Sequence, residues 1–277
     1  DRELDFRLGP EAFFDGILHP DDRFSWIELA DDLLSGNSGI STTVGLGIGL
    51  LRIQNDGVVI AVRYVLEGSP AHAAGIKRGD AITAINGREM NMQNYNSVLD
   101  DYYGSEPFTV RLGRFVDNGI TIDREVELTP IRNFQEKAIH YRSVIETPSQ
   151  RKVAYLFYNR FLNNQPMELL EAFDYFKSEG AQDLVLDLRY NLGGGIWIAG
   201  ILSGLIQAGF DEHQPFIQYK YNSNYRDQIV TYYQLFGGDS DDPEDIASAN
   251  QIVRAIKELN LNLPRVYIIA TGSSASA

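Results

Sequence analysis

The sequence predicts a multidomain α/β protein with an N-terminal helical region, a β-rich middle domain and an α/β core. The chain has 277 residues, 44% of them hydrophobic, which is enough for more than one buried core. Short β-type runs separated by glycine turns fill the middle of the chain. From Lys152 onward the pattern alternates strand, helix and strand. We therefore expect three units, at residues 1–42, 43–131 and 132–277.

The N-terminal region carries two short helical patterns, Glu11 to Leu18 and Phe24 to Leu34. A segment with proline and acidic residues separates them and suits the start of a helix. Between Gly36 and Thr43 the composition changes to glycine, serine, asparagine and threonine. This composition is typical of a linker, so we expect the second unit to start after it.

The middle unit is expected to be a compact β-rich domain. Its β-type runs alternate with glycine turns, and one helical pattern interrupts them at Gln93 to Tyr102. The predicted strands are Gly57 to Leu66, Asp80 to Ile85, Phe108 to Leu112 and Ile120 to Leu128.

The third unit starts with a strand, a helix and a second strand. The predicted elements are Val153 to Tyr158, Pro166 to Glu179, Asp183 to Arg189 and a buried helix at Ile196 to Ile206. The second strand is almost continuously apolar, which is typical of a central strand covered on both faces. A further helix, with Ser248 as its N-cap, precedes a strand at Arg265 to Ala270. Two parallel strands would then end at the same edge of one sheet, where α/β proteins build their sites.

Composition excludes several classes of function. The net charge is −14, so nucleic acids and anionic membrane surfaces are disfavoured as partners. The chain contains no cysteine, which excludes disulfides and thiolate chemistry, and its four histidines follow no metal-binding spacing. No apolar stretch reaches the roughly 18 residues of a membrane span. We therefore expect no metal, cofactor or transmembrane segment, and the first residue, Asp1, predicts a processed or trimmed chain.

Two small-residue turns follow the predicted parallel strands. Gly193, Gly194 and Gly195 lie between a buried strand and a buried helix, where backbone amides can point at an anion. The anion could be the oxyanion of acyl transfer or a phosphate, although no phosphate-loop motif accompanies the glycines. The last residues, Thr271 to Ala277, form a turn that can hold a nucleophilic serine. An ordinary serine-rich turn is the plain alternative.

The sequence Gly-Leu-Gly-Ile-Gly-Leu at 45–50 begins a pattern that resembles a PDZ domain over most of residues 44 to 130. Ser69-Pro70-Ala71, Gly79-Asp80 and Asn86-Gly87 complete the resemblance. Backbone amides between glycines can form a nest for a terminal carboxylate while the peptide adds as an extra strand. The nest is expected at Gly47 to Leu50, although a register that begins two residues earlier, at Gly45, fits almost as well, and a glycine-rich strand entry without a ligand is the alternative. The candidate peptide-binding residues are Leu46, Gly47, Ile48, Gly49 and Leu50.

The segment from Leu186 to Gly194, taken together with Gly272 to Ala277, resembles the carboxyl-terminal processing peptidases, or tail-specific proteases. This resemblance implies an α/β core related to the crotonase fold, preceded by a PDZ domain. It also implies a Ser-Lys dyad with Ser276 as nucleophile. Ala277 and a glycine of Gly193-Gly194 would supply the oxyanion amides, while Arg189 and Asn191 brace the turn.

The chain departs from the family in one respect, because the family's catalytic lysine lies downstream of the serine. The candidates upstream are in segments that we expect to be exposed, where a lysine keeps its charge. They are Lys152, Lys177, Lys220 and Lys257. We therefore expect a core that is incomplete at its C-terminal end.

The resemblance implies protein or peptide substrates with free carboxyl termini and an extracytoplasmic location, in the bacterial periplasm or cell envelope. An inactive PDZ peptide-binding protein or scaffold is the first alternative. A small-ligand binder is the second, because the core also resembles retinoid-binding relatives of these proteases. The sequence leaves open the oligomeric state and whether the PDZ domain activates or blocks the site.

Overall fold

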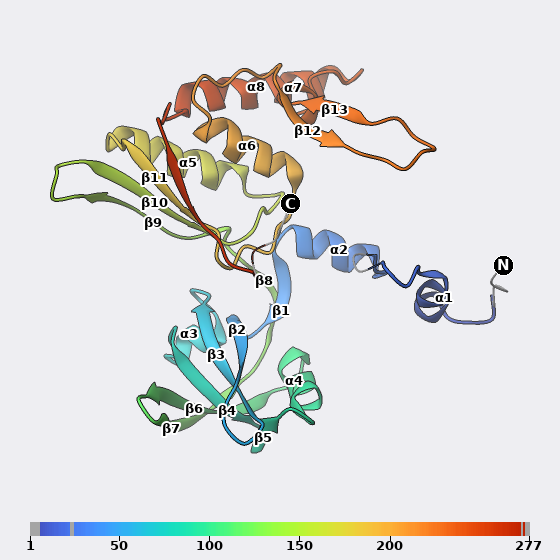
Figure 1. The fold of residues 1–277 in the computed structure, drawn as a ribbon, viewed down its shortest axis with the longest axis vertical. Coiled ribbons are helices and arrows are strands. Elements are labelled where there is room, and N and C mark those ends of the chain that lie inside the picture. Colours follow the sequence, from blue (N-terminus) through green and yellow to red (C-terminus); the bar gives the residue numbers. More distant parts are fainter. Residues whose placement is uncertain (1–5, 23–24, 273, 275–277) are drawn as a thin grey trace.

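The computed structural model describes residues 6–22, 25–272 and 274. Two separate hydrophobic cores define a β-rich unit and an α/β core, which Figure 1 shows at the bottom and at the top of the molecule. The helices α1 (Pro10–Ile17) and α2 (Ala30–Asn37) lie to one side of the junction between the two units. No helix in the described part of the chain is long and apolar enough to cross a membrane.

The β-rich unit is a six-stranded sheet with the order β2-β3-β5-β4-β6-β7, so β2 and β7 are its edges. Its strands are β2 (Leu46–Arg52), β3 (Gly57–Val65), β4 (Asp80–Ile85), β5 (Arg88–Asn91), β6 (Phe108–Val116) and β7 (Gly119–Leu128). The helices are α3 (Pro70–Ala73) and α4 (Tyr95–Tyr103). The alternating apolar residues of β3, β4 and β6 face one interior with Val98 of α4, which forms this unit's core.

A pair of strands joins the two units. β1 (Ile40–Thr43) pairs antiparallel with β8 (Ile131–Gln135), with Ile40 opposite Gln135. The prediction of a linker up to Thr43 is therefore wrong. A short polar segment gains its strand structure from a partner far away in sequence, which composition alone does not reveal. The two predicted domain boundaries each fall inside a strand of this pair.

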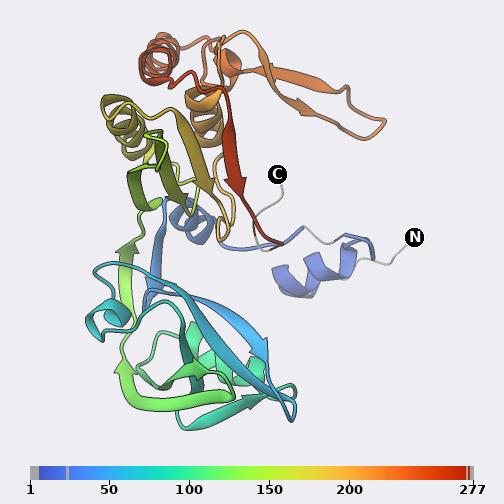
Figure 2. The ribbon, with the colours of Figure 1, turned by 60° about the vertical axis from the view of Figure 1, so that its left-hand side comes forward.

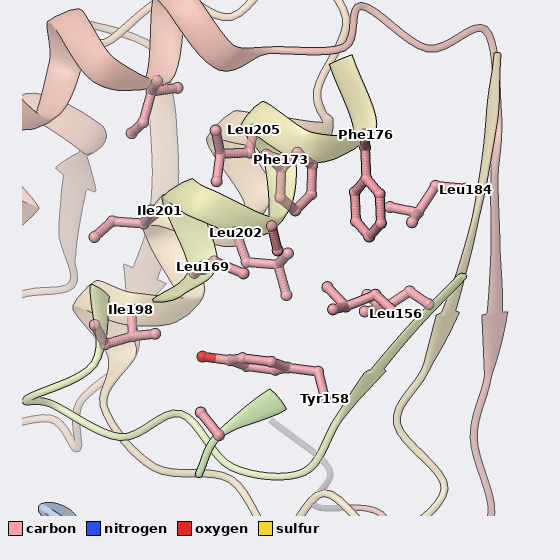
Figure 3. Packing of buried hydrophobic residues seen from close by; sticks show 14 of the residues in the cluster. Leu156, Tyr158, Leu169, Phe173, Phe176, Leu184, Ile198, Ile201, Leu202 and Leu205 are labelled. Atoms are coloured by element: carbon pink, nitrogen blue, oxygen red, sulfur yellow. The ribbon is translucent and has the colours of Figure 1, made fainter. Parts of the chain in front are cut away.

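The α/β core contains a four-stranded sheet with the order β14-β11-β10-β9. β10 (Lys152–Tyr158), β11 (Asp183–Asp187) and β14 (Val266–Ile269) are parallel, and β9 (Ile139–Glu146) is antiparallel to β10. The helices α5 (Pro166–Ser178) and α6 (Ile196–Ile206) pack against the sheet, and α8 (Pro243–Leu259) packs against these two helices. Figure 3 shows Phe173 and Phe176 of α5 meeting Leu156 and Leu184 from the strands.

Only one face of this sheet is covered by helices among the described residues. Ala154, Leu156 and Leu184 are fully buried beneath them, whereas Tyr155 and Val185, which alternate with them, are half-buried. The prediction of a central strand covered on both faces is therefore wrong for this part of the chain. An apolar residue on each face does not tell whether a helix lies above it.

A long excursion separates α6 from α8. It contains α7 (Tyr232–Leu235) and the strands β12 (Pro215–Tyr219) and β13 (Gln228–Thr231), which form a hairpin that projects from the core (Figure 1 and Figure 2). α8 begins earlier than predicted, because the side chain of Asp242, not that of Ser248, accepts from a backbone amide at the N-terminus. The acidic run before α8 is thus the capped start of the helix.

Candidate active site and peptide-binding strand

The glycine turn after β11 has a backbone that only glycine accommodates. Gly193 and Gly194 have φ values of 93° and 136°. A Cβ atom at Gly194 would lie 2.2 Å from the carbonyl oxygen of Phe161, which is closer than real Cβ atoms approach. Phe161 and Gly194 form an isolated parallel bridge. The turn is therefore built by close packing against the segment that follows β10.

Hydrogen bonds distinguish the three glycine amides. The amide of Gly193 donates to Asn191 Oδ1 at 2.8 Å, and that of Gly195 donates to the carbonyl of Phe161 at 2.8 Å. The amide of Gly194 meets no acceptor among the described residues, and the residue is exposed. Of the two glycines expected from the sequence, Gly194 therefore has the amide that no described acceptor engages, whereas the amide of Gly193 is already bonded.

The prediction that Arg189 and Asn191 brace this turn is confirmed. Arg189 Nη2 lies 2.6 Å from Asp187 Oδ2, and its Nε lies 2.9 Å from Oδ1. The Asn191 side chain donates to the carbonyl of Tyr158 at 3.1 Å and also holds the Gly193 amide. The side chains of Arg189 and Asn191 thus fix the turn through hydrogen bonds to Asp187, Tyr158 and Gly193.

Asp187 anchors the start of this turn, and the sequence alone did not single it out. Its side chain is fully buried and also accepts a hydrogen bond from Tyr155 Oη at 2.6 Å. Burial by itself raises the pKa of this carboxyl group, but the bonds from Arg189 and Tyr155 outweigh it and hold the pKa below its usual value. An acidic residue inside the apolar run from Leu184 to Leu188 is the signal that could have found it.

The second turn leaves the same edge of the sheet. β14 pairs in parallel with β11, with Ile269 opposite Asp187, so Thr271 and the glycine turn both follow the carboxyl ends of their strands. The predicted arrangement of two parallel strands at one edge is confirmed. The expected nucleophile Ser276 and the expected oxyanion residue Ala277 lie outside the described residues.

The upstream lysines make contacts away from this edge. Lys152 Nζ donates to the carbonyl of Glu179, and Lys177 Nζ donates to that of Glu258. Lys257 pairs with Glu212, and Lys220 is exposed. The described residues also contain no group of three acidic or histidine side chains that could hold a metal ion.

The candidate peptide-binding strand, β2, is an edge of its sheet. Gly45 has a φ of 83°, and it is the one residue of the 45–50 segment with a left-handed backbone. Gly47 and Gly49 lie in regular β2 structure, and Gly47 is opposite Tyr64 in β3. The turn that precedes the strand therefore supports the register beginning at Gly45, so that Leu46, Gly47 and Ile48 follow it.

Packing gives Gly47 and Gly49 a second reason to lack a side chain. A Cβ atom at Gly47 would lie 2.2 Å from the ring of Tyr64, and one at Gly49 would lie 2.4 Å from Arg63 Nε. From the other side, Tyr102 of α4 donates from its hydroxyl to the carbonyl of Leu46 at 2.6 Å. Burial raises the pKa of Tyr102, so the hydroxyl stays protonated. α4 and the start of β2 are thus fastened together.

An aromatic contact connects β3, which pairs with the candidate peptide-binding strand β2, with the glycine turn. The ring of Tyr64 lies 5.9 Å from that of Tyr190, which precedes Asn191, and 5.0 Å from His140. The guanidinium groups of Arg63 and Arg78 lie over the same Tyr190 ring, at 5.7 and 5.5 Å. The β-rich unit therefore touches the core beside the turn that carries Gly194.

Comparison with known families defines both units. Residues 62–111 match the family model described as PDZ domain, and residues 152–277 match the model described as peptidase family S41. The protein named probable CtpA-like serine protease of Staphylococcus aureus (strain bovine RF122 / ET3-1) is 32% identical over 186 residues, which cover 66% of this chain and 35% of that protein. The counterpart of Staphylococcus haemolyticus (strain JCSC1435) is 27% identical over 269 residues, or 96% of this chain and 46% of the relative.

Among solved structures, a protein of Bacteroides fragilis NCTC 9343 assigned to the S41 proteases matches over 100% of this chain and 68% of its own, with a TM-score of 0.64 and 24% identity. The fold class is thus confirmed as a multidomain α/β protein with a PDZ domain and an S41 peptidase core. The chain is thus similar to the CtpA-like serine proteases, with a segment that matches peptidase family S41 and a segment that matches a PDZ domain. It spans 35% of the length of the S. aureus relative.

Proposed function

We propose that this chain supplies the PDZ domain and the nucleophile-bearing part of a serine endopeptidase. In this proposal the PDZ domain binds the free carboxyl terminus of a protein or peptide substrate, which adds as a strand to β2. Ser276 then attacks a peptide bond of the same substrate and forms an acyl-enzyme. The amides of Gly194 and Ala277 stabilise the oxyanion, and the general base is a lysine that is not among residues 1–277.

One observation carries the proposal. The exposed, unbonded amide of Gly194 and the turn that leads to Ser276 follow neighbouring parallel strands at one sheet edge. A tetrahedral oxyanion needs donors at about 2.7–3.1 Å from the position where its charge develops. The glycine turn supports this use. Asn191 accepts a hydrogen bond from the amide of Gly193 and Phe161 accepts one from that of Gly195, whereas no described residue accepts one from Gly194.

The peptide-binding half of the proposal rests on β2 as an open edge and on the turn at Gly45. An edge strand presents unpaired backbone groups, and a carboxylate can be held by the amides that follow the turn. The domain boundaries at 42/43 and 131/132 and an extracytoplasmic location, in the bacterial periplasm or envelope, also belong to the proposal. Their support is the family resemblance.

The test is Ser276→Ala in the full protein. Cleavage of an unstructured protein substrate should disappear, while binding of a fluorescent peptide with a free carboxyl terminus stays within about twofold of the unmodified protein. Retained cleavage would refute Ser276 as nucleophile. The same peptide with an amidated terminus serves as the control for the carboxylate.

A peptide-binding protein without catalysis is the second candidate, and one observation favours it. The β-rich unit has its own complete hydrophobic core among the described residues. Lys152, Lys177 and Lys257, in contrast, make contacts away from the candidate site. Peptide binding by a full protein that cleaves no substrate would support this second candidate.

A further inference from the structure

The two turns at the sheet edge are joined by side-chain hydrogen bonds. Ser274 Oγ donates to the carbonyl of Leu188 at 2.6 Å, and Thr271 Oγ1 donates to the carbonyl of Arg189 at 2.9 Å. The bonded residues are 86 and 82 positions apart in the sequence. These two bonds therefore tie the turn before Ser276 directly to the start of the glycine turn.

Ser274 also closes its own turn. Its backbone amide donates to the carbonyl of Thr271 at 2.9 Å, and its hydroxyl accepts from the amide of Thr271 at 3.0 Å. The hydroxyl thus acts as donor and acceptor at once, which fixes its rotation. The Ser274 hydroxyl therefore stabilises the turn from Thr271 to Ser274 and bonds this turn to Leu188, the residue that follows β11.

The Leu188 carbonyl is also part of the hydrogen-bond network that fixes the glycine turn. It also accepts from the backbone amide of Asn191 at 3.1 Å, and the side chain of Asn191 holds the amide of Gly193. The Leu188 carbonyl is therefore the shared acceptor of Ser274 and Asn191. A shift of Ser274 relative to this carbonyl would move the nucleophile turn relative to Gly194.

We propose that Ser274 and Thr271 are positioning residues, a clamp that sets the distance between Ser276 and the oxyanion amide of Gly194. This inference rests on the proposed function, because the clamp matters for catalysis only if Ser276 attacks the substrate. Both hydroxyls act through backbone carbonyls and touch no reacting atom. Catalytic geometry is sensitive to such supports, since a misplacement of about 1 Å can cost about 100-fold in rate.

The test compares Ser274→Ala, Ser274→Thr and Ser178→Ala in the full protein. Ser178 is the matched control, because its hydroxyl also donates to a backbone carbonyl, that of Tyr175 at 2.8 Å, at the end of α5. The readouts are kcat, KM and the rate at which a fluorophosphonate probe phosphonylates Ser276 with loss of fluoride. Ser274→Ala should lower kcat and this labelling rate by about 10- to 100-fold with KM within about twofold. Ser274→Thr should recover most of the loss, and Ser178→Ala should change neither rate.

The outcomes separate the clamp from the proposed function. Labelling of Ser274→Ala at the rate of Ser178→Ala overturns the clamp and leaves Ser276 as nucleophile. An unmodified protein that the probe does not label at Ser276 overturns both. If Ser274→Ala does not fold, Thr271→Val tests the second half of the clamp, because it removes the hydroxyl that donates to Arg189. A drop of about 3- to 10-fold in its labelling rate, the value of one net hydrogen bond, supports the clamp, and an unchanged rate overturns it.

Discussion

Replacing Asp187 by asparagine should damage the candidate active site more than it damages the fold. The carboxylate of Asp187 receives the Arg189 guanidinium, the Arg189 amide and the Tyr155 hydroxyl. Asparagine keeps one acceptor oxygen and turns an NH₂ group toward the arginine or the tyrosine. Because Arg189 and the residues that follow it form the turn, we expect the Gly194 amide to move when this anchor is lost.

The magnitude follows from burial and from the kind of bond. A hydrogen bond to a charged group contributes about 1.5–3 kcal/mol net, and a neutral one about 1 kcal/mol. The Arg189 side chain is 32% exposed, so water compensates part of the lost ion pair. We therefore expect Asp187→Asn to lower the free energy of unfolding by about 2–3 kcal/mol. A shifted oxyanion donor should lower turnover by about 100-fold.

The assay pairs urea unfolding at pH 7 with kcat measured on the full protein. Asp183→Asn is the matched control, because Asp183 lies on the same strand and the same face as Asp187, is also buried, and pairs with Arg151 and Arg265 at the far end. Its partners are 36% and 56% exposed, so we expect a loss of about 1–2 kcal/mol and an unchanged kcat. Equal losses of kcat in the two variants would refute the positioning argument.

Two further predictions concern the same turn. The pKa of Asp187 is lowered in the folded protein, so its contribution to stability is complete above the unfolded pKa of about 3.9 and is lost as the pH falls through the folded value. The difference in unfolding free energy between the unmodified protein and Asp187→Asn should therefore be smaller at pH 3 than at pH 7 in urea titrations, and an equal difference would contradict the ion pair. Gly194→Ala places a Cβ atom against Phe161 and should lower turnover by about 100-fold, whereas Gly180→Ala, with a φ of 72° and open space around its Cβ, should cost only about 1–2 kcal/mol of stability. Matching kinetics for these two variants would refute the steric argument.

The sequence predicts those elements best whose signals are strong and local. The bounds of β4 and α6 agree with the predicted ranges Asp80 to Ile85 and Ile196 to Ile206. Both segments are mostly apolar and are bounded by glycine or polar residues, so burial and turn chemistry give the same answer. The parallel pairing of β11 with β14 follows from the same rhythm of strand and helix.

The sequence predicts poorly whatever depends on a distant partner. The strand β1 is short and polar, and it exists because β8 supplies its hydrogen bonds. The glycines of β2 indicate a binding motif or a plain strand entry when the sequence is read alone. The structure shows that packing against Tyr64 and Arg63 also requires Gly47 and Gly49. Such requirements become visible only when the neighbouring strand is in place.

The sequence by itself determined the strand and helix rhythm from Val153 to Ile206, the glycine turn, the small-residue turn and the family resemblance, because these depend on residues that are neighbours along the chain. The tertiary structure decided which of the glycine amides is free. Gly193 and Gly194 are adjacent and chemically identical, but Asn191 takes the amide of one, and the bridge to Phe161 leaves that of the other exposed. The physical reason is that a hydrogen-bond donor becomes available for chemistry only when no other acceptor reaches it, and Phe161 reaches the turn from a segment about thirty residues earlier.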